Sequence, residues 1–326
     1  MDFEQNLAFE ESLFGDNPVF ERIEIANLEF WVDRLSALPQ YRPLFLDNIV
    51  NLCQQYCDSD NFRNRLLEKA IYTCPVLIFR LYLKEIYALS EIMVFLMSKL
   101  AYVPSFYFKK GIGDFKSFIK EKLYPEEYDK SFFENDDEID FRIQYGYIPH
   151  SIEYCLKYDD LQSLRVFFSE ILSLKEYSIS GSPFEWAKIP RKLGYLGFSG
   201  YFGSLNCFKY LLMNGFEIDD SVKDIVVCSG HTDLYHMCNC SITNIYEKVS
   251  FASMFCRISL LNFLIDSVSD VSICDKQFSD SPLQIGAKEG HLRVVELLIT
   301  KGFNIEKTNY LLINVLMVEL PSYVHV

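Results

Sequence analysis

The sequence predicts an all-α protein in which a helical N-terminal region precedes a solenoid of stacked helix pairs. Two observations lead to this fold class. Apolar residues in the first 108 positions recur at helical spacing, without an alternating run bounded by hairpin turns. Beyond residue 149, a phrase of about 20 residues recurs at a constant offset, which indicates structural repeats. A chain of 326 residues can bury its apolar surface in such an array without one large core.

The region 1–108 is predicted to be a series of short helices. Ile25, Leu28 and Val32 share one helical face, and Pro39 is expected to end that helix. Further helices are expected at 46–56, at 62–74 and, as one or two buried helices, at 76–100. The segment 109–148 contains glycines, a proline and the acidic run 134–138, and it is predicted to be an acidic surface connection.

The clearest repeat occupies residues 281–305. Ser281 and Pro282 are expected to start its first helix, with the hydroxyl as N-cap and the proline at the first helical position. Gly290 and Gly302 suit the turns that follow its two helices. The apolar residues of the second helix, which include Leu298, form the face that stacks on neighbouring repeats.

Other copies of this phrase extend the array over residues 149–326. Gly203-Ser204-Leu205 matches Gly290-His291-Leu292 at an offset of 87 positions without a gap. Weaker copies complete the series, so that the turns between paired helices are expected near residues 159, 203, 230, 256 and 290. A sixth repeat begins near Asn314 and stops at Val326 without a second helix. Its apolar end is either the mark of a truncated product or a docking surface.

The repeat 281–305 closely resembles the ankyrin consensus, from which Gln284 and Gly286 depart. The resemblance covers about residues 150–326. The segments Ser151–Asp160 and Phe202–Gly215 are also similar to phrases of the divergent ankyrin-like proteins expanded in single-celled parasites, most of which have no known function. The resemblance implies an ankyrin-repeat α-solenoid that binds another protein without catalysis.

The resemblance also implies which residues contact a partner. Ankyrin arrays generally bind through the fingertips and the exposed, concave face formed by the first helices. On this chain, the corresponding residues of the clear repeat are Lys276, Gln277, Asp280, Gln284, Lys288 and Glu289. In the earlier copy, Tyr201 and Phe202 occupy the positions of Lys288 and Glu289 and could serve as aromatic contact anchors. The alternative is that these two rings pack against the insertion Ser169–Arg191.

Composition and charge exclude several classes of partner. The formal charge is −14, from 45 acidic against 31 basic residues, and no stripe of Lys and Arg is present. Nucleic acids and anionic membrane surfaces are therefore not expected partners. No run approaches the roughly 18 uncharged residues of a membrane span. The N-terminus lacks the pattern of a signal peptide, so we expect a cytoplasmic or nuclear protein with reduced cysteines.

One group of residues suggests metal chemistry. His231, His236, Cys238 and Cys240 lie within ten residues, but Cys-x-Cys is a poor chelating spacing, and His231 fills the turn position of a repeat. We therefore expect no metal and no cofactor. Phosphate loops, dinucleotide-binding glycines and nucleophile elbows are absent from the sequence, which indicates that the chain is not an enzyme.

The sequence thus predicts a non-catalytic intracellular scaffold that binds a protein through its array. Two alternatives stay open. The chain could be an adaptor whose N-terminal helices recruit a second protein complex while the repeats choose the client. It could also be a metal-dependent or thiol enzyme, for which Cys238 and Cys240 would be the residues to test.

Overall fold

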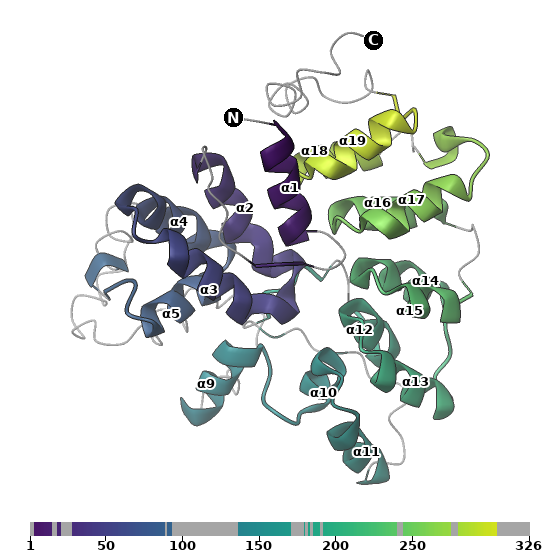
Figure 1. The fold of residues 1–326 in the computed structure, drawn as a ribbon. Coiled ribbons are helices and arrows are strands. Elements are labelled where there is room, and N and C mark those ends of the chain that lie inside the picture. Colours follow the sequence, from purple (N-terminus) through teal and green to yellow (C-terminus); the bar gives the residue numbers. More distant parts are fainter. Residues whose placement is uncertain are drawn as a thin grey trace. The chain divides into compact units, whose positions relative to one another are not determined.

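The computed structural model contains helices as its secondary-structure elements (Figure 1). It describes residues 3–14, 18–20, 28–88, 90–92, 136–170, 179, 182, 185–189, 192–239, 244–274 and 280–304. Within these residues, no helix has the length and apolar character needed to cross a membrane. The chain forms two compact units. We call residues 24–154 with 180–191 the helical unit, and residues 1–23, 155–179 and 192–326 the array unit.

The helical unit is built around the packing of α2 against α3 and α4, and of α5 against α3 and α4. Trp31, Leu35, Ile49 and Leu66 are fully buried in this unit. Ser59 starts α4 as its N-cap, and its hydroxyl accepts a hydrogen bond from the backbone N–H of residue 62. The elements are α2 (Leu28–Tyr41), η1 (Pro43–Phe45), α3 (Leu46–Tyr56), α4 (Asp60–Thr73), α5 (Pro75–Leu83) and α9 (Asp136–Tyr145).

One local expectation for this unit is wrong. Helix α2 continues through Pro39 to Tyr41, because a proline in the last turn removes only the hydrogen bond of its own nitrogen. The predicted acidic connection stays a prediction, and within it residues 136–145 form α9. There Glu138 and Arg142, one turn apart, approach to 3.8 Å. Residues 101–135 lie outside the described part of the chain.

The middle of the predicted insertion belongs to the helical unit. The Trp186 indole N–H donates a hydrogen bond to the Pro43 carbonyl at 3.1 Å, and the Lys188 backbone N–H donates to the Gln40 carbonyl at 3.0 Å. These bonds attach residues 185–189 to the last turn of α2 and to η1. The expected division into 1–108, 109–148 and 149–326 stays a prediction, and the two compact units group residues 1–23 and 180–191 differently.

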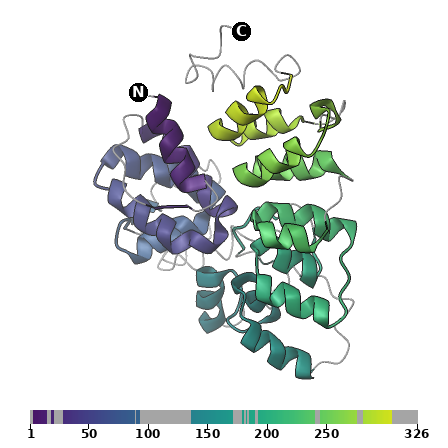
Figure 2. The same ribbon diagram turned by 45° about the vertical axis from the view of Figure 1, so that its right-hand side comes forward.

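The array unit consists of consecutive helix pairs (Figures 1 and 2). First helices pack on first helices, as in α12 with α14, α14 with α16 and α16 with α18. Second helices pack on second helices, as in α11 with α13 and α17 with α19. The pairs are α10 (Ile152–Tyr158) with α11 (Leu161–Glu170), α12 (Tyr195–Phe202) with α13 (Leu205–Met213), α14 (Asp220–Ile225) and η3 (Val226–Ser229) with α15 (Thr232–Met237), α16 (Ile245–Met254) with α17 (Ile258–Asp266), and α18 (Pro282–Lys288) with α19 (Leu292–Thr300). A further short helix, η4 (Val271–Cys274), follows α17.

Five turns between paired helices share one backbone feature. Each contains one residue in the left-handed region, with φ of 58° at Asp159, 79° at Gly203, 73° at Gly230, 51° at Cys256 and 71° at Gly290. Glycine adopts this conformation without steric cost, whereas aspartate and cysteine carry a Cβ atom that opposes it. The array therefore keeps its turn geometry even where the sequence departs from glycine. The predicted sixth repeat at 305–326 lies outside the described residues.

The clear repeat has the local structure that its sequence predicts. The Ser281 hydroxyl accepts a hydrogen bond from Gln284 N, and the Gln284 side chain accepts one from Ser281 N, which completes a capping box. Gly286 is small for a packing reason, because a Cβ atom there would lie 2.6 Å from Val294 Cγ1. Leu298 is fully buried. The fold is thus all-α, with a helical unit and an ankyrin-type solenoid of helix pairs.

Candidate functional site

Four of the predicted contact residues lie along α18 and just beyond its two ends. Asp280 and Lys288 are exposed and form an ion pair with each other. Glu289, which follows α18 as its C-cap, is half-buried. Gln284 is also half-buried, and its side-chain oxygen is engaged by the Ser281 N–H at 2.8 Å in the capping box. The structure thus brings Asp280 and Lys288 together and leaves both charges accessible to a partner.

The other four predicted contact residues do not add to this surface. Lys276 and Gln277 lie outside the described residues. Tyr201 and Phe202 are only 4% and 7% exposed, and the Tyr201 ring meets the Phe255 ring edge-on at a centroid distance of 5.7 Å. This burial corrects the expectation of two exposed aromatic anchors, because a partner could not reach rings that pack inside the array. Among the described residues, Phe255 in the turn after α16 is a neighbour that covers Tyr201, and most of the insertion Ser169–Arg191 lies outside the described part of the chain.

A second surface feature follows from the register of the repeats. Seven residues after each left-handed turn residue, the chain places an apolar side chain that is half-buried or exposed. These positions fall on the second helices α11, α13, α15, α17 and α19. Sequence reasoning missed this row, although aligning the five turns is sufficient to find it. Its members are Val166 (56% exposed), Tyr210, Met237, Phe263 (48% exposed) and Leu297.

The N-terminal helix α1 (Phe3–Phe14) is part of the array unit and packs against α19. The Glu10 carboxylate accepts a hydrogen bond from the Leu292 backbone N–H at 2.9 Å. His291, the N-cap residue of α19, makes no side-chain capping bond of its own. Glu11 adds an ion pair with Arg293 at 3.4 Å on the surface. Glu10 thus caps α19 from a distant part of the chain, with its charge at the favourable end of the helix dipole.

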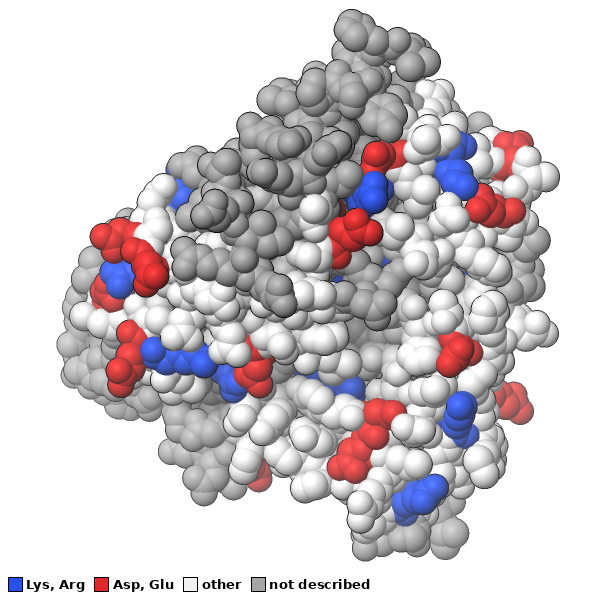
Figure 3. All heavy atoms as spheres, in the orientation of Figure 1, with Lys and Arg blue, Asp and Glu red and all other residues white. Residues whose placement is uncertain are grey.

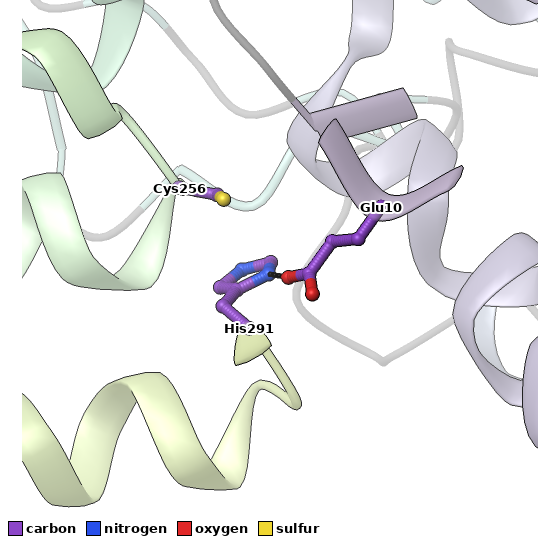
Figure 4. Close-up of side chains that lie close together, drawn as sticks. All are labelled: Glu10, Cys256 and His291. Carbon is purple, nitrogen blue, oxygen red and sulfur yellow. Dashed lines mark ion pairs between the residues drawn. The ribbon is translucent and has the colours of Figure 1, made fainter. Parts of the chain in front are cut away.

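Three potential metal ligands meet beside this cap (Figure 4). Glu10, Cys256 and His291 are 1%, 1% and 0% exposed, and one ligand atom of each lies within 4.8 Å of the others. Glu10 Oε1 lies 3.7 Å from His291 Nδ1, and His291 Nε2 lies 3.0 Å from the Met254 carbonyl oxygen. Because a carbonyl only accepts hydrogen bonds, Nε2 must carry a proton. In the neutral ring, Nδ1 therefore presents its lone pair toward Glu10.

The described members of the group of histidines and cysteines that the sequence singled out, His231, His236 and Cys238, do not assemble in this way. His236 is exposed, with its ring edge-on to Phe263 at 5.9 Å, whereas Cys238 is 2% exposed. Cys240 lies outside the described residues. In the part of the chain that the structure describes, the potential ligands that converge are Glu10, Cys256 and His291 instead. No local spacing could have revealed them, since they come from three distant segments.

Burial keeps several other thiols protonated. It raises the pKa of Cys57 to about 12, and it raises the pKa of Cys53 and of Cys207 even further, with Asp159 adding to the effect at Cys207. Such thiols are poor nucleophiles at neutral pH, because the thiolate is the reactive form. The environments of these three residues therefore favour a packing role.

Charges on the face drawn in Figure 3 are mixed in sign. Basic side chains of the described residues lie next to acidic ones on this face and do not merge into a broad basic area. Arg80 pairs with Asp47 in the helical unit, and Lys301 pairs with Asp266 in the array unit.

Comparisons with known proteins give likenesses among solved structures. No protein-family model matches the sequence, and no curated protein matches it. Among solved structures, the chain is similar to the ankyrin repeat domain of human ASB11, with 14% sequence identity and a TM-score of 0.31. The match covers 48% of this chain and 85% of that one. At this level the likeness carries no argument of its own, and the ankyrin-like assignment rests on the helix pairs and their five turns.

Proposed function

We propose that this chain is a non-catalytic scaffold that binds a partner protein through the first-helix face of its array unit. The observation that supports the proposal most directly is the repetition of one helix-pair geometry, with a left-handed residue at all five turns. Stacked repeats place equivalent positions side by side along an extended surface, which suits the recognition of another macromolecule. Among the described residues discussed above, no group of activated catalytic side chains is found. A binding role therefore needs fewer assumptions than a catalytic role.

The surface along α18, from Asp280 to Glu289, is the part of this face that we propose as the contact. Asp280 and Lys288 present opposite charges to solvent beside the half-buried Glu289. Because exposed ion pairs contribute little to stability, exchanging these charges should spare the fold and change only what the surface recognises. The likeness to parasite ankyrin-like proteins and a cytoplasmic or nuclear location remain parts of this proposal, and the nine described cysteines are thiols, as such a location would require.

The test uses the full chain with a photo-crosslinking amino acid at one position at a time. Position 289 reports the first-helix face, position 263 reports the apolar row on the second helices, and exposed Asp233 on α15 serves as a control. An extract of the cells that express the protein supplies the partner. We expect a defined adduct from position 289 that is absent from position 233 and is lost when the exchange Asp280→Lys, Lys288→Asp is added. An adduct from position 263 alone would contradict the assigned face, and no specific adduct from any position would contradict the scaffold.

An adaptor role is the second candidate, favoured by the separate compact helical unit. That unit exposes Leu44 and Leu83, at 42% and 58%, and exposed apolar side chains of this size are good contact residues. The adaptor predicts a second partner that crosslinks to position 83 of the full chain and is retained by the exchange variant at 280 and 288. If position 83 captures nothing specific, the adaptor role is excluded at this surface.

A further inference from the structure

The N-terminal helix α1 joins the array in the way that a separate peptide would. Residues 1–23 belong to the array unit, although the chain that follows them, residues 24–154, belongs to the helical unit. Glu10 of α1 is 282 positions away from Leu292 of α19, to which it is hydrogen-bonded. The place of α1 in the array is therefore set by the contacts of this helix and not by the order of the repeats.

Two adjacent carboxylates of α1 meet the N-terminal end of α19. Glu10 Oε2 accepts the hydrogen bond of Leu292 N at 2.9 Å, and the Glu11 carboxylate lies 3.4 Å from the Arg293 guanidinium. The N-terminal end of a helix carries the positive end of its dipole, and Arg293 adds a full positive charge beside it. This end of α19 therefore favours an acidic segment.

Two apolar residues follow these carboxylates. Leu13 and Phe14 are 0% and 1% exposed, and the Phe14 ring meets the His291 ring edge-on at a centroid distance of 5.0 Å. Glu10 and Phe14 are one helical turn apart, so they lie on the same face of α1. An amphipathic helix that places one face against a binding surface is a common mode of peptide recognition.

The cap that Glu10 supplies has a counterpart inside the array. At α13, the capping carboxylate is that of Asp159, the left-handed turn residue of the preceding repeat, which accepts the hydrogen bond of Cys207 N at 2.8 Å. The turn residue that precedes α18 and α19 in the same way is Cys256, with φ of 51° against 58° at Asp159. A carboxylate oxygen of Glu10 lies within 4.8 Å of Cys256 Sγ (Figure 4). Helix α1 thus supplies from outside the repeats the carboxylate that an aspartate at position 256 would supply from within.

We propose that the turn at Cys256 and the start of α19 form a docking site for an acidic amphipathic helix, which α1 occupies and from which a partner's helix of the same kind displaces it. The partner helix carries a glutamate that caps α19 and an apolar residue one turn later. Because α1 is tethered to the array, its effective concentration at the site is high, and a partner must compete with it. Helix α1 is therefore an autoinhibitory segment. This site uses other residues than the proposed contact along α18, so each can fail without the other.

A fluorescent peptide of residues 1–16 is the probe for the first experiment, and its anisotropy is measured against the full chain. Glu10→Ala in the chain weakens the docking of its own α1 and leaves the array surface unchanged. Loss of a helix cap changes an equilibrium by about 2- to 30-fold, so the peptide should bind this variant more tightly than wild type by a factor in that range. Glu11→Ala removes the neighbouring carboxylate, which is 61% exposed, and should have a smaller effect. Equal binding to wild type and Glu10→Ala, or no binding to Glu10→Ala, would overturn the proposal.

A second variant keeps α19 capped and releases α1 by another route. The carboxylate of Cys256→Asp should take the place of Glu10, as Asp159 does at α13, and repel it, so the amides of residues 3–14 should exchange hydrogen faster than in wild type. Cys256→Ser, which adds no charge, is the matched control and should leave this exchange unchanged. Mass spectrometry measures the exchange, and circular dichroism verifies that each variant is folded. Amides of α1 that are unprotected in wild type, or equally protected in Cys256→Asp, would refute the shared cap position and with it the docking site.

Discussion

Helix α12 offers a sharp test of repeat packing, because two of its glycines differ only in what surrounds them. A Cβ atom at Gly200 would lie 2.7 Å from Val226 Cγ1 and 3.3 Å from Phe208, and both neighbours are fully buried. A Cβ atom at Gly197 would meet Leu193 and Ile225 at 3.5 Å and 3.7 Å, which are ordinary contacts. The two sites therefore separate the effect of close helix packing from the effect of helix propensity.

The expected magnitudes follow from these distances. Alanine in place of a helical glycine stabilises the helix by about 0.5–1 kcal/mol at either site. At Gly200, however, Val226 Cγ1 would have to move by about 0.7 Å to reach an ordinary contact of 3.4 Å. Overpacking of this kind costs about 1–3 kcal/mol in a close-packed core. Gly200→Ala should therefore be less stable than Gly197→Ala by about 1–3 kcal/mol, since the propensity gain is common to both.

Urea unfolding followed by far-ultraviolet circular dichroism measures this difference. Both tryptophans, Trp31 and Trp186, lie in the helical unit, so their fluorescence follows that unit in parallel. We expect the circular dichroism midpoint of Gly200→Ala to fall below the wild-type value and that of Gly197→Ala to stay level or rise. Equal stability of the two variants would refute the close approach of α12 to the neighbouring repeat, and with it the assigned stacking.

Three further perturbations test buried charge, capping and thiol chemistry. Lys248 forms an ion pair with Asp224 at 3.1 Å, and the two side chains are 1% and 7% exposed. Lys248→Met leaves the Asp224 charge buried without its partner, so it should lower the free energy of unfolding, measured by chemical denaturation, by about 3–5 kcal/mol. Adding Asp224→Asn should recover part of this loss. Asp159 caps α13, because its carboxylate accepts a hydrogen bond from the Cys207 N–H at 2.8 Å, and its backbone is left-handed. Asp159→Ala loses the cap and places alanine in the left-handed region, so it should lower the unfolding free energy by about 2 kcal/mol. Asp159→Asn should cost less, since asparagine keeps an acceptor oxygen and tolerates this backbone conformation. Burial raises the pKa of Cys57 to about 12, so alkylation of Cys57 by iodoacetamide at pH 8 should be far slower than that of an exposed cysteine. Because the folded pKa of Cys57 lies above the unfolded value near 9, its contribution to stability is complete below pH 9 and is lost as the pH rises further. The melting temperature should therefore fall more steeply above pH 9 in wild type than in Cys57→Ser.

The repeat register was predictable because it depends on local sequence. A turn residue must precede the second helix at a fixed distance from its apolar positions, and this spacing survives even where Asp159 or Cys256 replaces glycine. The capping box at Ser281 is equally local, since both partners lie within one turn of α18. Features of this kind need no knowledge of the tertiary structure.

The burial of two aromatic residues could be predicted only with knowledge of the tertiary structure. Tyr201 and Phe202 occupy positions that are polar and exposed in the clear repeat, so their exposure was a reasonable expectation by analogy. In this array the turn residue Phe255 of a later repeat covers Tyr201, and Lys157 of an earlier repeat lies 5.4 Å from the Phe202 ring centre. Because the repeats differ in length, equivalent positions contact different neighbours. The periodicity of the sequence does not predict these contacts.

The capping of second helices explains how distant segments come to be part of the array. Ser204 and His291 precede α13 and α19 without making a side-chain capping bond, so the first amides of both helices need acceptors from elsewhere. Asp159 supplies one carboxylate from the preceding turn, and Glu10 supplies the other from α1. At both helices, an N-cap residue that makes no side-chain capping bond is accompanied by a carboxylate from another segment. Sequence alone cannot reveal which carboxylate caps each helix, because that depends on the tertiary path of the chain.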